Sequence, residues 1–433
     1  MRQSHPLTPA ALALVALVPA AAAQQVQQVR QLTLAEAVQR ALEVQPAVVE
    51  ARGTVSNAGW QKRAAYGAFL PSLTLGSSAF RQNSPSIVNG LSATAGTYQY
   101  SSSLSLSLDL FTGFRRLARY RNAAATEDAA DAGLVNQRYQ VTVATQQAFF
   151  TALADEDLVR VAEAQVQRAK EELQISVNKF LAGAATRSDT LTSTVDLGTA
   201  QLTLLQARAN LATAQANLAR QAGIDGPVQA VPDSQRPALP DTTGLRAAAV
   251  AGAPVVVQAD AQARAASAAV WDARSQYLPT VTAGFSTSSQ GLTEPWSGFD
   301  AGNRNLNQFR IGLSWTLFNG FQREQTAAQN VASADLARAQ AADTRRQLDA
   351  QLTQQVAALF TAYTQIGITG ANVAAATEAR RVQQERYRLG AATLLDLLIA
   401  EANLTQAAVN QVQARYNYLN ARAQLEALVG RSL

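Results

Sequence analysis

The sequence of 433 residues contains no cysteine and a single histidine, His5, in its N-terminal segment. The rest of the chain therefore lacks the imidazole and thiolate groups that most often bind transition metals, attack substrates or act as general bases. It can form no disulfide, and it has no N-terminal cysteine to be lipidated. Catalysis by other side chains stays open, but no catalytic constellation is recognisable, so we expect no catalytic residue, metal site or cofactor.

Charged and aromatic residues are also scarce, at 15% and 6% of the chain. The net charge is only +5, and the basic residues are dispersed rather than clustered. A nucleic-acid-binding protein usually carries a concentrated basic face, so we expect no nucleic-acid partner. The abundance of Ala and Gln instead suits long helices that pack closely through small side chains.

A long apolar run occurs only near the N-terminus. There Arg2 precedes an apolar segment at 11–18 and a run of alanines at 21–23. The pattern is typical of a Sec-type signal peptide, and the apolar segment is shorter than the roughly 20 residues of a membrane-spanning helix. We predict a signal peptide over 1–23 and a mature chain that begins near Gln24.

The chain repeats itself, because five segments recur in the same order at a spacing of 207 or 208 residues. They are PAVVEAR at 46–52 with PVVVQAD at 254–260, FLPSLTLGSS at 69–78 with YLPTVTAGFS at 277–286, LDLFTGFRR at 108–116 with WTLFNGFQR at 315–323, Gly183 and Asp189 with Gly390 and Asp396, and NLARQAG at 217–223 with QLEALVG at 424–430. Chance does not produce five matches in register. We predict one repeat over 24–223, a Pro-rich linker over 224–240 and a second repeat over 241–433.

Helical patterns dominate each repeat. The predicted helices cover 34–66, 113–180 and 186–222 in the first repeat, and 241–277, 320–388 and 393–429 in the second. The middle helix would be about 100 Å long at 1.5 Å per residue, which matches its two shorter neighbours laid end to end. We therefore expect a rod-like layer of helices with coiled-coil packing.

Two strands in each repeat alternate apolar and polar residues. The segments SLSLSLDL at 103–110 and FRIGLSWTL at 309–317 do so most clearly, with partners at 73–81 and 281–289. Such strands fit either a transmembrane barrel or a soluble hairpin packed on helices. The signal peptide and the polar loops at 83–96 and 291–306 favour the membrane. Flanking aromatics do so too, as an interfacial girdle would: Phe80, Tyr98, Tyr100, Phe111, Trp296, Phe299 and Phe318.

Four strands are too few to close a barrel, since the smallest transmembrane barrels have about eight. An open edge in lipid would leave backbone groups without hydrogen bonds. If the strands span a membrane, the chain must therefore oligomerise, with eight strands from two copies or twelve from three.

Several of these segments resemble the TolC-type outer-membrane efflux protein family over nearly the whole mature chain. They are LTLAEAVQRAL at 32–42, the strand starts FLPSLTL and YLPTVTA, the turns LFTGF and LFNGF, the paired glycines and aspartates, and ARYNYLNARAQLEALVG at 414–430. The resemblance implies a mostly α fold with a transmembrane β-barrel. The family forms a homotrimer with one shared twelve-stranded barrel in the lipid of the Gram-negative outer membrane, continuing into a long α-helical tunnel across the periplasm.

The function implied by this resemblance is that of a passive exit duct with porin activity. Such a duct docks a periplasmic adaptor (membrane fusion) protein and an inner-membrane pump or ABC transporter. The sequence does not indicate whether the cargo is a drug, a metal, a solvent or a secreted protein. A structural coiled-coil protein of the cell surface is the alternative, but it would have no paired strands.

The resemblance also assigns roles to the two breaks between long helices. In the family these turns form the periplasmic end of the tunnel and meet the adaptor's hairpin tips. The corresponding docking residues are Leu181, Gly183, Ala184, Leu389, Gly390 and Ala391. Glycine at each break is also expected at a helix C-cap with positive φ, and the two interpretations are compatible.

A periplasmic gate is implied at Asp396, Ile399, Asp189 and Tyr387. Asp396 would recur around the trimer as an acidic ring, although the helix dipole alone also favours an acid in a first turn. Asp189 and Tyr387 match positions that hold the family's helices closed. The family's arginine in that network is replaced by Ala392, and its second acid by Ile399. We therefore expect a weaker or different latch.

Overall fold

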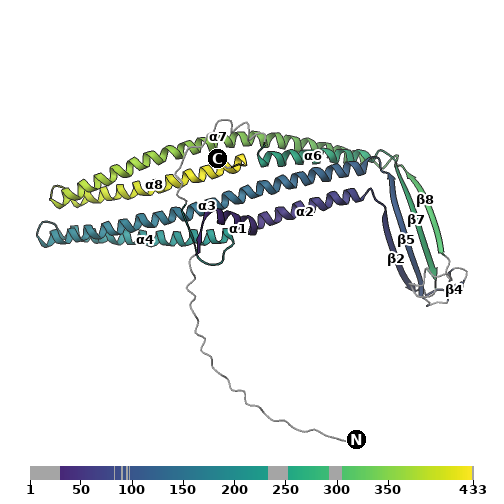
Figure 1. Cartoon of the computed structure of the whole chain (residues 1–433), viewed down its shortest axis with the longest axis horizontal. Helices are drawn as coiled ribbons and strands as arrows, with labels where there is room; N and C mark the ends of the chain where they lie inside the picture. Colours follow the sequence, from purple (N-terminus) through teal and green to yellow (C-terminus); the bar gives the residue numbers. More distant parts are fainter. Residues whose placement is uncertain are drawn as a thin grey trace, which may run out of the picture.

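The computed structural model describes residues 30–81, 83–88, 91–93, 96, 98–232, 252–291 and 305–431. Long helices form an elongated layer, and a sheet continues from one end of it (Figure 1). The predicted signal peptide at 1–23 lies outside the described residues, as do Trp296 and Phe299 of the predicted girdle.

The two repeats follow the same order of elements. The first contains β1 (Arg30–Leu32), α1 (Leu34–Val44), α2 (Pro46–Gly67), β2 (Ser72–Arg81), β3 (Ser86–Val88), β4 (Leu91–Ala93), β5 (Tyr98–Phe111), α3 (Arg115–Leu181), α4 (Arg187–Ala222) and β6 (Val228–Ala230). The second contains α6 (Pro254–Ser275), β7 (Thr280–Gly291), β8 (Asn305–Ser314), α7 (Gln322–Arg388) and α8 (Leu394–Val429). The predicted two-fold repeat is thus confirmed, and strand β6 lies within the stretch expected to be a linker.

The predicted long helices are confirmed to within two residues at each end. Both α3 and α7 contain 67 residues, and α4 and α8 contain 36 each. The predicted helix over 34–66 is wrong as a single helix, because it divides at Gln45, whose ψ is 126°. A residue before proline disfavours the helical conformation, and Pro46 has no N–H to continue the helix.

The helices pack with a seven-residue period, as coiled coils do. Buried positions recur at this spacing in both long helices: Ala118, Ala125 and Ala132, then Ala152, Val159 and Val166 in α3, and Ala334, Ala341 and Leu348 in α7. Alanine at these positions lets neighbouring backbones approach closely. The expected shallow packing of Ala-rich helices is therefore confirmed.

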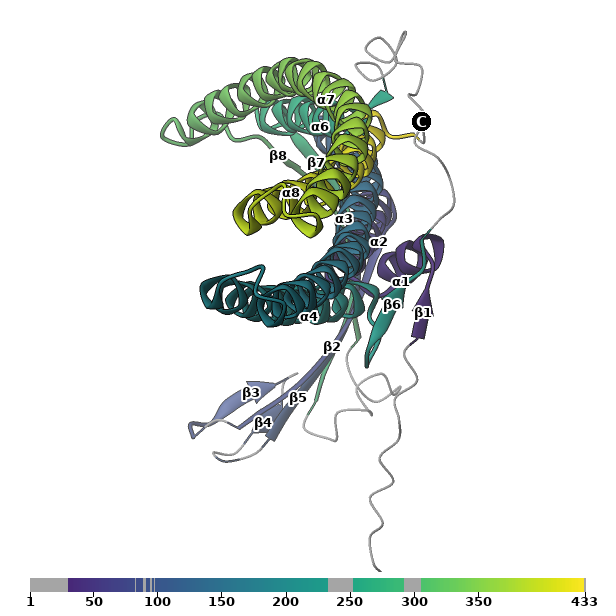
Figure 2. The same ribbon diagram turned by 90° about the vertical axis from the view of Figure 1, so that its left-hand side faces the viewer.

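The helical layer is curved, with the long helices arranged along an arc (Figure 2). On the strand side the order is α2, α3, α6 and α7, and on the far side it is α4, α3, α8 and α7. One edge of the layer is therefore formed by α2 and α4, and the other by α7. Helix α1 and the short strands β1 and β6 lie on the convex side of the arc.

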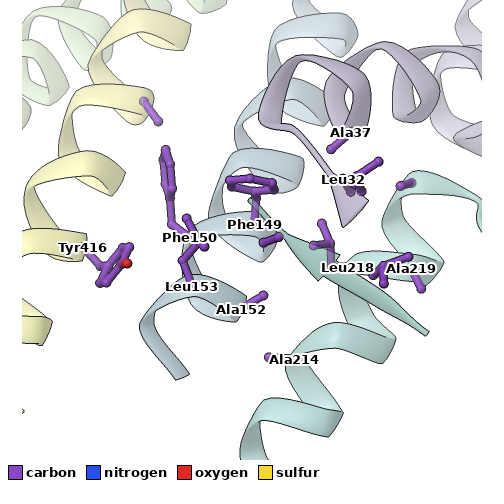
Figure 3. Close-up of a cluster of buried hydrophobic side chains, with 14 residues drawn as sticks. Leu32, Ala37, Phe149, Phe150, Ala152, Leu153, Ala214, Leu218, Ala219 and Tyr416 are labelled. Carbon is purple, nitrogen blue, oxygen red and sulfur yellow. The ribbon is translucent and has the colours of Figure 1, made fainter. Parts of the chain in front are cut away.

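A hydrophobic core fixes α1 and these short strands to the layer near mid-length (Figure 3). Strands β1 and β6 pair in parallel, and Leu32 of β1 is fully buried. Phe149 of α3 and Leu218 of α4 are buried in the same core. Truncating one such leucine to alanine typically costs about 2–5 kcal/mol.

The sheet has the order β2-β5-β7-β8, and all its pairs are antiparallel. Leu73, Leu106, Phe285 and Phe309 are cross-strand neighbours, and all four are exposed. The adjacent row on the opposite face runs from Ser72 through Ser107 and Gly284 to Arg310. The expected division into an apolar and a polar face is confirmed. Strands β2 and β8 are the outer strands, and each has one edge that pairs with no other strand of the described residues.

Strand β8 ends earlier than the predicted segment 309–317. Its last residue, Ser314, pairs with Thr280, the first residue of β7, so Trp315 to Leu317 have no strand beside them. The Trp315 indole N–H instead donates to the carbonyl oxygen of Tyr277 at 3.1 Å.

An arginine in each repeat stabilises the turn from strand to helix. Arg116 donates to the carbonyl oxygen of Leu110 at 3.1 Å and lies over the ring of Phe69. Its repeat counterpart, Arg323, donates to the carbonyl oxygen of Thr316 at 3.0 Å and lies over the ring of Tyr277. Each guanidinium thus bonds carbonyl groups at the end of the sheet, where the regular strand pairing stops.

Candidate gate and docking tips

The helix reversals at the end remote from the sheet are two closely similar turns. Gly183 and Gly390 have φ of 73° and 79°, a conformation that glycine adopts readily. The N–H of Ala184 donates to the carbonyl of Lys179, and that of Ala391 to the carbonyl of Arg386, each at 2.7 Å. These are the bonds of a Schellman C-cap, and the C-cap expected at both breaks is confirmed.

The tips also expose large apolar side chains. Leu181 and Leu389 are 77% and 78% exposed, the highest values among the leucines of the described residues. No atom lies within 4 Å of the position that a Cβ would take on Gly183 or Gly390. Open space therefore lies beside both tip glycines.

Asp189 and Asp396 each close a capping box at the start of a helix. The Asp189 carboxylate accepts from the Thr186 N–H at 2.9 Å, and Asp396 accepts from the Thr393 N–H at the same distance. In return, each aspartate N–H donates to the threonine hydroxyl at 3.2 Å. A carboxylate in this position therefore has a local structural role in both repeats.

The carboxylate of Asp396 remains at the surface. Hydrogen bonds from the Thr393 hydroxyl and N–H, with a smaller effect of Arg386, lower its pKa below the usual value. It is therefore ionised in neutral solution. Ile399, also exposed, follows Asp396 by three residues, so both side chains lie on one face of α8.

Tyr387 is buried and contacts the other hairpin through Lys179. The Lys179 ammonium lies 4.1 Å from the centroid of the Tyr387 ring and donates a hydrogen bond to the Tyr387 carbonyl oxygen. The Tyr387 hydroxyl has no hydrogen-bond partner within the described part of the chain, so it is not bonded to Asp189. Lys179 thus makes the contact with Tyr387 that joins the two hairpins near the tips.

A second connection between the hairpins lies farther from the tips. Glu401 of α8 accepts from Arg168 of α3 at 2.6 Å and also from Arg380 of α7. Arg168 donates in addition to the Thr405 hydroxyl at 3.2 Å. One buried carboxylate thus joins three helices, and removing one member of such a group leaves an unpaired buried charge.

Glu172 of α3 is buried beside this group, with only 1% of its surface exposed. Burial, followed by the nearby Glu401 and Asp196 carboxylates, raises its pKa to about 8, and Arg380 opposes the shift. Burial and Glu401 also raise the pKa of Asp196 on α4. Glu172 is therefore protonated at neutral pH, and its Oε1 atom has no hydrogen-bond partner among the described residues.

The sequence analysis did not identify this group, although a signal was present. Leu394, Leu397 and Leu404 follow the alternating three- and four-residue spacing of a coiled-coil seam, and Glu401 occupies the remaining seam position. An acid in a seam predicts a buried partner of opposite charge. Of the two partners, Arg380 lies only 21 residues away in the same hairpin, whereas Arg168 lies 233 residues away and no local pattern indicates it.

Asp155, Glu156 and Asp157 are three consecutive acids of α3. All three are partly buried. Asp157 accepts from the Tyr416 hydroxyl at 2.8 Å, and Glu156 accepts from Gln229. Within the described ranges, no group of three or more His, Cys, Asp or Glu residues could hold a metal ion. No helix in those ranges is long and apolar enough to cross a membrane.

Comparisons with known proteins identify the fold. The family described as Outer membrane efflux protein (OEP) matches residues 37–223 and again 245–431. The solved structure of VceC from Vibrio cholerae is similar with a TM-score of 0.78 and 20% identity, covering 92% of this chain and 96% of that one. The structure of the CmeC outer membrane channel of Campylobacter jejuni is similar with a TM-score of 0.79 and 17% identity, covering 92% of this chain and 85% of that one.

Two relatives resemble the chain in sequence. The alkaline protease secretion protein AprF of Pseudomonas aeruginosa is 26% identical over 351 residues, which span 76% of this chain and 69% of AprF. The outer membrane efflux protein BepC of Brucella suis is 25% identical over 388 residues, which span 84% of this chain and 78% of BepC. The resemblance expected from the sequence is confirmed: the chain belongs to the outer membrane efflux protein family, a family of outer-membrane channels and not of enzymes.

Proposed function

We propose that three copies of this chain close into one tube, which serves as the passive exit duct of an efflux or secretion system. The observation that supports this proposal most strongly is that each outer edge of the sheet continues into an outer edge of the helical layer. Helix α2 leads directly into the outer strand β2, and the outer strand β8 leads directly into α7. Each edge therefore runs continuously along the molecule (Figure 1).

The sheet supplies the first argument for closure. Its apolar face is exposed, which suits lipid, but β2 and β8 each leave one row of backbone groups unpaired. In lipid such an edge is unfavourable by several kcal/mol per group. Pairing β8 of one copy with β2 of the next removes both edges, and the family resemblance selects twelve strands over eight.

The helical edges supply the second argument. Exposed apolar residues line α4 at heptad-like spacing, namely Leu191, Val195, Leu202 and Leu205. On α7, Ile368 and Val382 are exposed and lie two heptads apart. Exposed apolar residues that recur along one helix favour an interface at that helix. Packing α4 of one copy against α7 of the next would bury both stripes and continue the arc into a cylinder.

The tips are proposed to dock a periplasmic adaptor, which connects the duct to an inner-membrane pump or ABC transporter. Their exposed leucines and glycine turns support this role. AprF is named for protease secretion and BepC for efflux, so the relatives support both kinds of cargo. We propose the partnership without assigning the cargo.

The gate is proposed to lie just inside the tips. Asp396 and Ile399 would form an acidic and an apolar ring around the axis of the trimer. The link from Lys179 to Tyr387 and the Glu401 ion group would hold the two hairpins of each copy together. This latch differs from one centred on Asp189, because the Asp189 carboxylate is engaged in its capping box.

Planar-bilayer recording of the purified protein tests this function. A trimeric duct with a narrow entrance predicts small, cation-selective conductance that increases when the latch is weakened. An absence of any conductance, even from latch variants that remain folded, would contradict the duct.

A further inference from the structure

A cavity lies where the helices meet the sheet, between the start of α3 and the end of α6. Its volume is about 230 Å³, and its walls include Phe114, Leu117, Arg121, Trp271, Arg274 and Leu278. The lining is thus mainly apolar, with two guanidinium groups. Nothing in the gate or the docking tips uses this cavity, which lies at the opposite end of the helices.

The cavity continues the apolar face of the sheet. The Phe114 ring stacks edge-on against Phe111, with the centroids 5.5 Å apart. Phe111 pairs across the strands with Val281, which pairs in turn with Leu313 on the apolar face. Phe114 therefore lies on the side that faces lipid if the sheet is a barrel wall.

The apolar walls are unusually open to solvent for such large side chains. Phe114 is 65% exposed and Trp271 is 63% exposed, while Leu278 is 42% exposed. Helices α3 and α6 are the central helices of this half of the layer, so packing at the edges of the copy does not cover them. Tryptophan at this level is typical of the boundary between lipid and water.

The two arginines are available for an anion. Arg274 lies over the Trp271 ring, with 5.8 Å from its Cζ to the centroid, and Arg121 follows Leu117 by one helical turn. Neither has an ion-pair partner among the described residues, and no acid lines the cavity. Guanidinium groups bind phosphate through two parallel hydrogen bonds, and they stack favourably on the face of an aromatic ring.

We propose that this cavity binds an anionic phospholipid, with an acyl chain against Phe114, Trp271 and Leu278 and the phosphate bound by Arg121 and Arg274. The inference rests on the proposed barrel, which places the cavity at the periplasmic leaflet. The site would fix the height of the duct in the membrane, because it joins a rigid helix junction to a headgroup.

Native mass spectrometry of the detergent-solubilised protein tests the site. The probes are phosphatidylglycerol and phosphatidylcholine with identical acyl chains. We expect phosphatidylglycerol to remain bound at lower concentration than phosphatidylcholine, and Arg121→Gln with Arg274→Gln to reduce its binding about tenfold. The matched control is Arg119→Gln with Arg264→Gln, which removes the same charge from the same helices and should retain binding. Equal binding by both double variants would overturn the site.

Fluorescence quenching by brominated phosphatidylglycerol distinguishes a failure of the lipid site from a failure of the proposed barrel. One protein keeps Trp271 as its only tryptophan, and another carries only Phe309→Trp, in the middle of β8. We expect both to be quenched. Quenching of Phe309→Trp without Trp271 would reject the lipid site and leave the barrel intact, and no quenching of Phe309→Trp would reject the barrel.

Discussion

The Lys179 ammonium of α3 lies 4.1 Å from the centroid of the Tyr387 ring of α7 and donates to the Tyr387 carbonyl oxygen. This contact joins the two hairpins of one copy within eight residues of both tip glycines. A cation over an aromatic ring typically contributes about 0.5–2 kcal/mol, depending on how far it is desolvated. The contact is therefore strong enough to bias an equilibrium between closed and open entrances.

Replacing this lysine should open the entrance. Lys179→Met keeps the aliphatic stem but removes the charge and the hydrogen bond, so we expect single-channel conductance or open probability to rise several-fold. Lys170→Met is the control, because Lys170 lies on the same helix and is exposed. If both variants conduct like the unmodified protein, Lys179 is not part of the latch.

Glu401 should contribute more to stability than any exposed acid on these helices. Glu401→Gln leaves Arg168 and Arg380 without their shared carboxylate, and breaking such a buried group typically costs about 3–5 kcal/mol. Glu163→Gln removes a pair with Arg208 that is about half exposed, for which about 0–1 kcal/mol is usual. Denaturant unfolding of the two variants measures the difference, and equal losses would argue against the buried group.

Closure should depend on pH through Glu172. Its pKa is raised from 4.5 to about 8 by burial and by the carboxylates of Glu401 and Asp196, opposed by Arg380, while the two hairpins are packed together. The closed form therefore retains the proton more strongly than a form in which Glu172 is solvated. Its advantage is complete below about pH 4.5 and is lost as pH rises towards 8, where Glu172 ionises beside two other acids.

Open probability should accordingly increase between about pH 5 and 8 and then level off. Glu172→Gln, which imitates the protonated acid, should remove this dependence and favour the closed form at all pH values. Bilayer recordings over this range provide the measurement. A pH profile that Glu172→Gln leaves unaltered would assign the dependence to another group.

Asp396 should set the affinity of the entrance for divalent cations. Asp396→Asn removes the charge but keeps an oxygen that can accept from Thr393, so the capping box and the fold are preserved. We expect block by divalent cations from the periplasmic side to weaken about tenfold. Asp189→Asn is the control, because it makes the equivalent change in the first repeat. It shows whether weaker block comes from the ring of Asp396 or from any loss of one negative charge near the tips. Undiminished block in Asp396→Asn would place the cation site elsewhere.

Much of this fold could be predicted from the sequence because its elements are long and periodic. The alternation in β5 and the two 67-residue helices follow from local patterns. One prediction failed because the helix-breaking effect of Pro46 was given too little weight, so two helices were predicted as one. The other failed because β8 ends at Ser314, where its neighbour β7 begins, and the sequence of β8 alone does not show this. Both errors concern where an element ends rather than which element it is.

The candidate site was only partly predictable. The tip glycines and the capping aspartates have sequence signatures, and the structure places them at the expected turns. The pairs of Lys179 with Tyr387 and of Arg168 with Glu401 join residues more than 200 positions apart. Such contacts depend on how two hairpins lie side by side, which no periodicity within one helix determines.

Closure of three copies through α4 and α7 is tested most directly by cross-linking at the two edges. Leu191 follows Gly183 by eight residues, and Val382 precedes Gly390 by eight, so both lie at one height above the tips. Both are exposed, on opposite edges of the copy. Because the chain has no cysteine, Leu191→Cys with Val382→Cys introduces the only thiols.

On oxidation, the double variant should yield covalent dimers and trimers and nothing larger, while each single variant stays monomeric on a denaturing gel. Such a ladder that stops at three is the result predicted for a closed trimeric tube. Products that stop at dimers, extend beyond trimers or fail to form would contradict it.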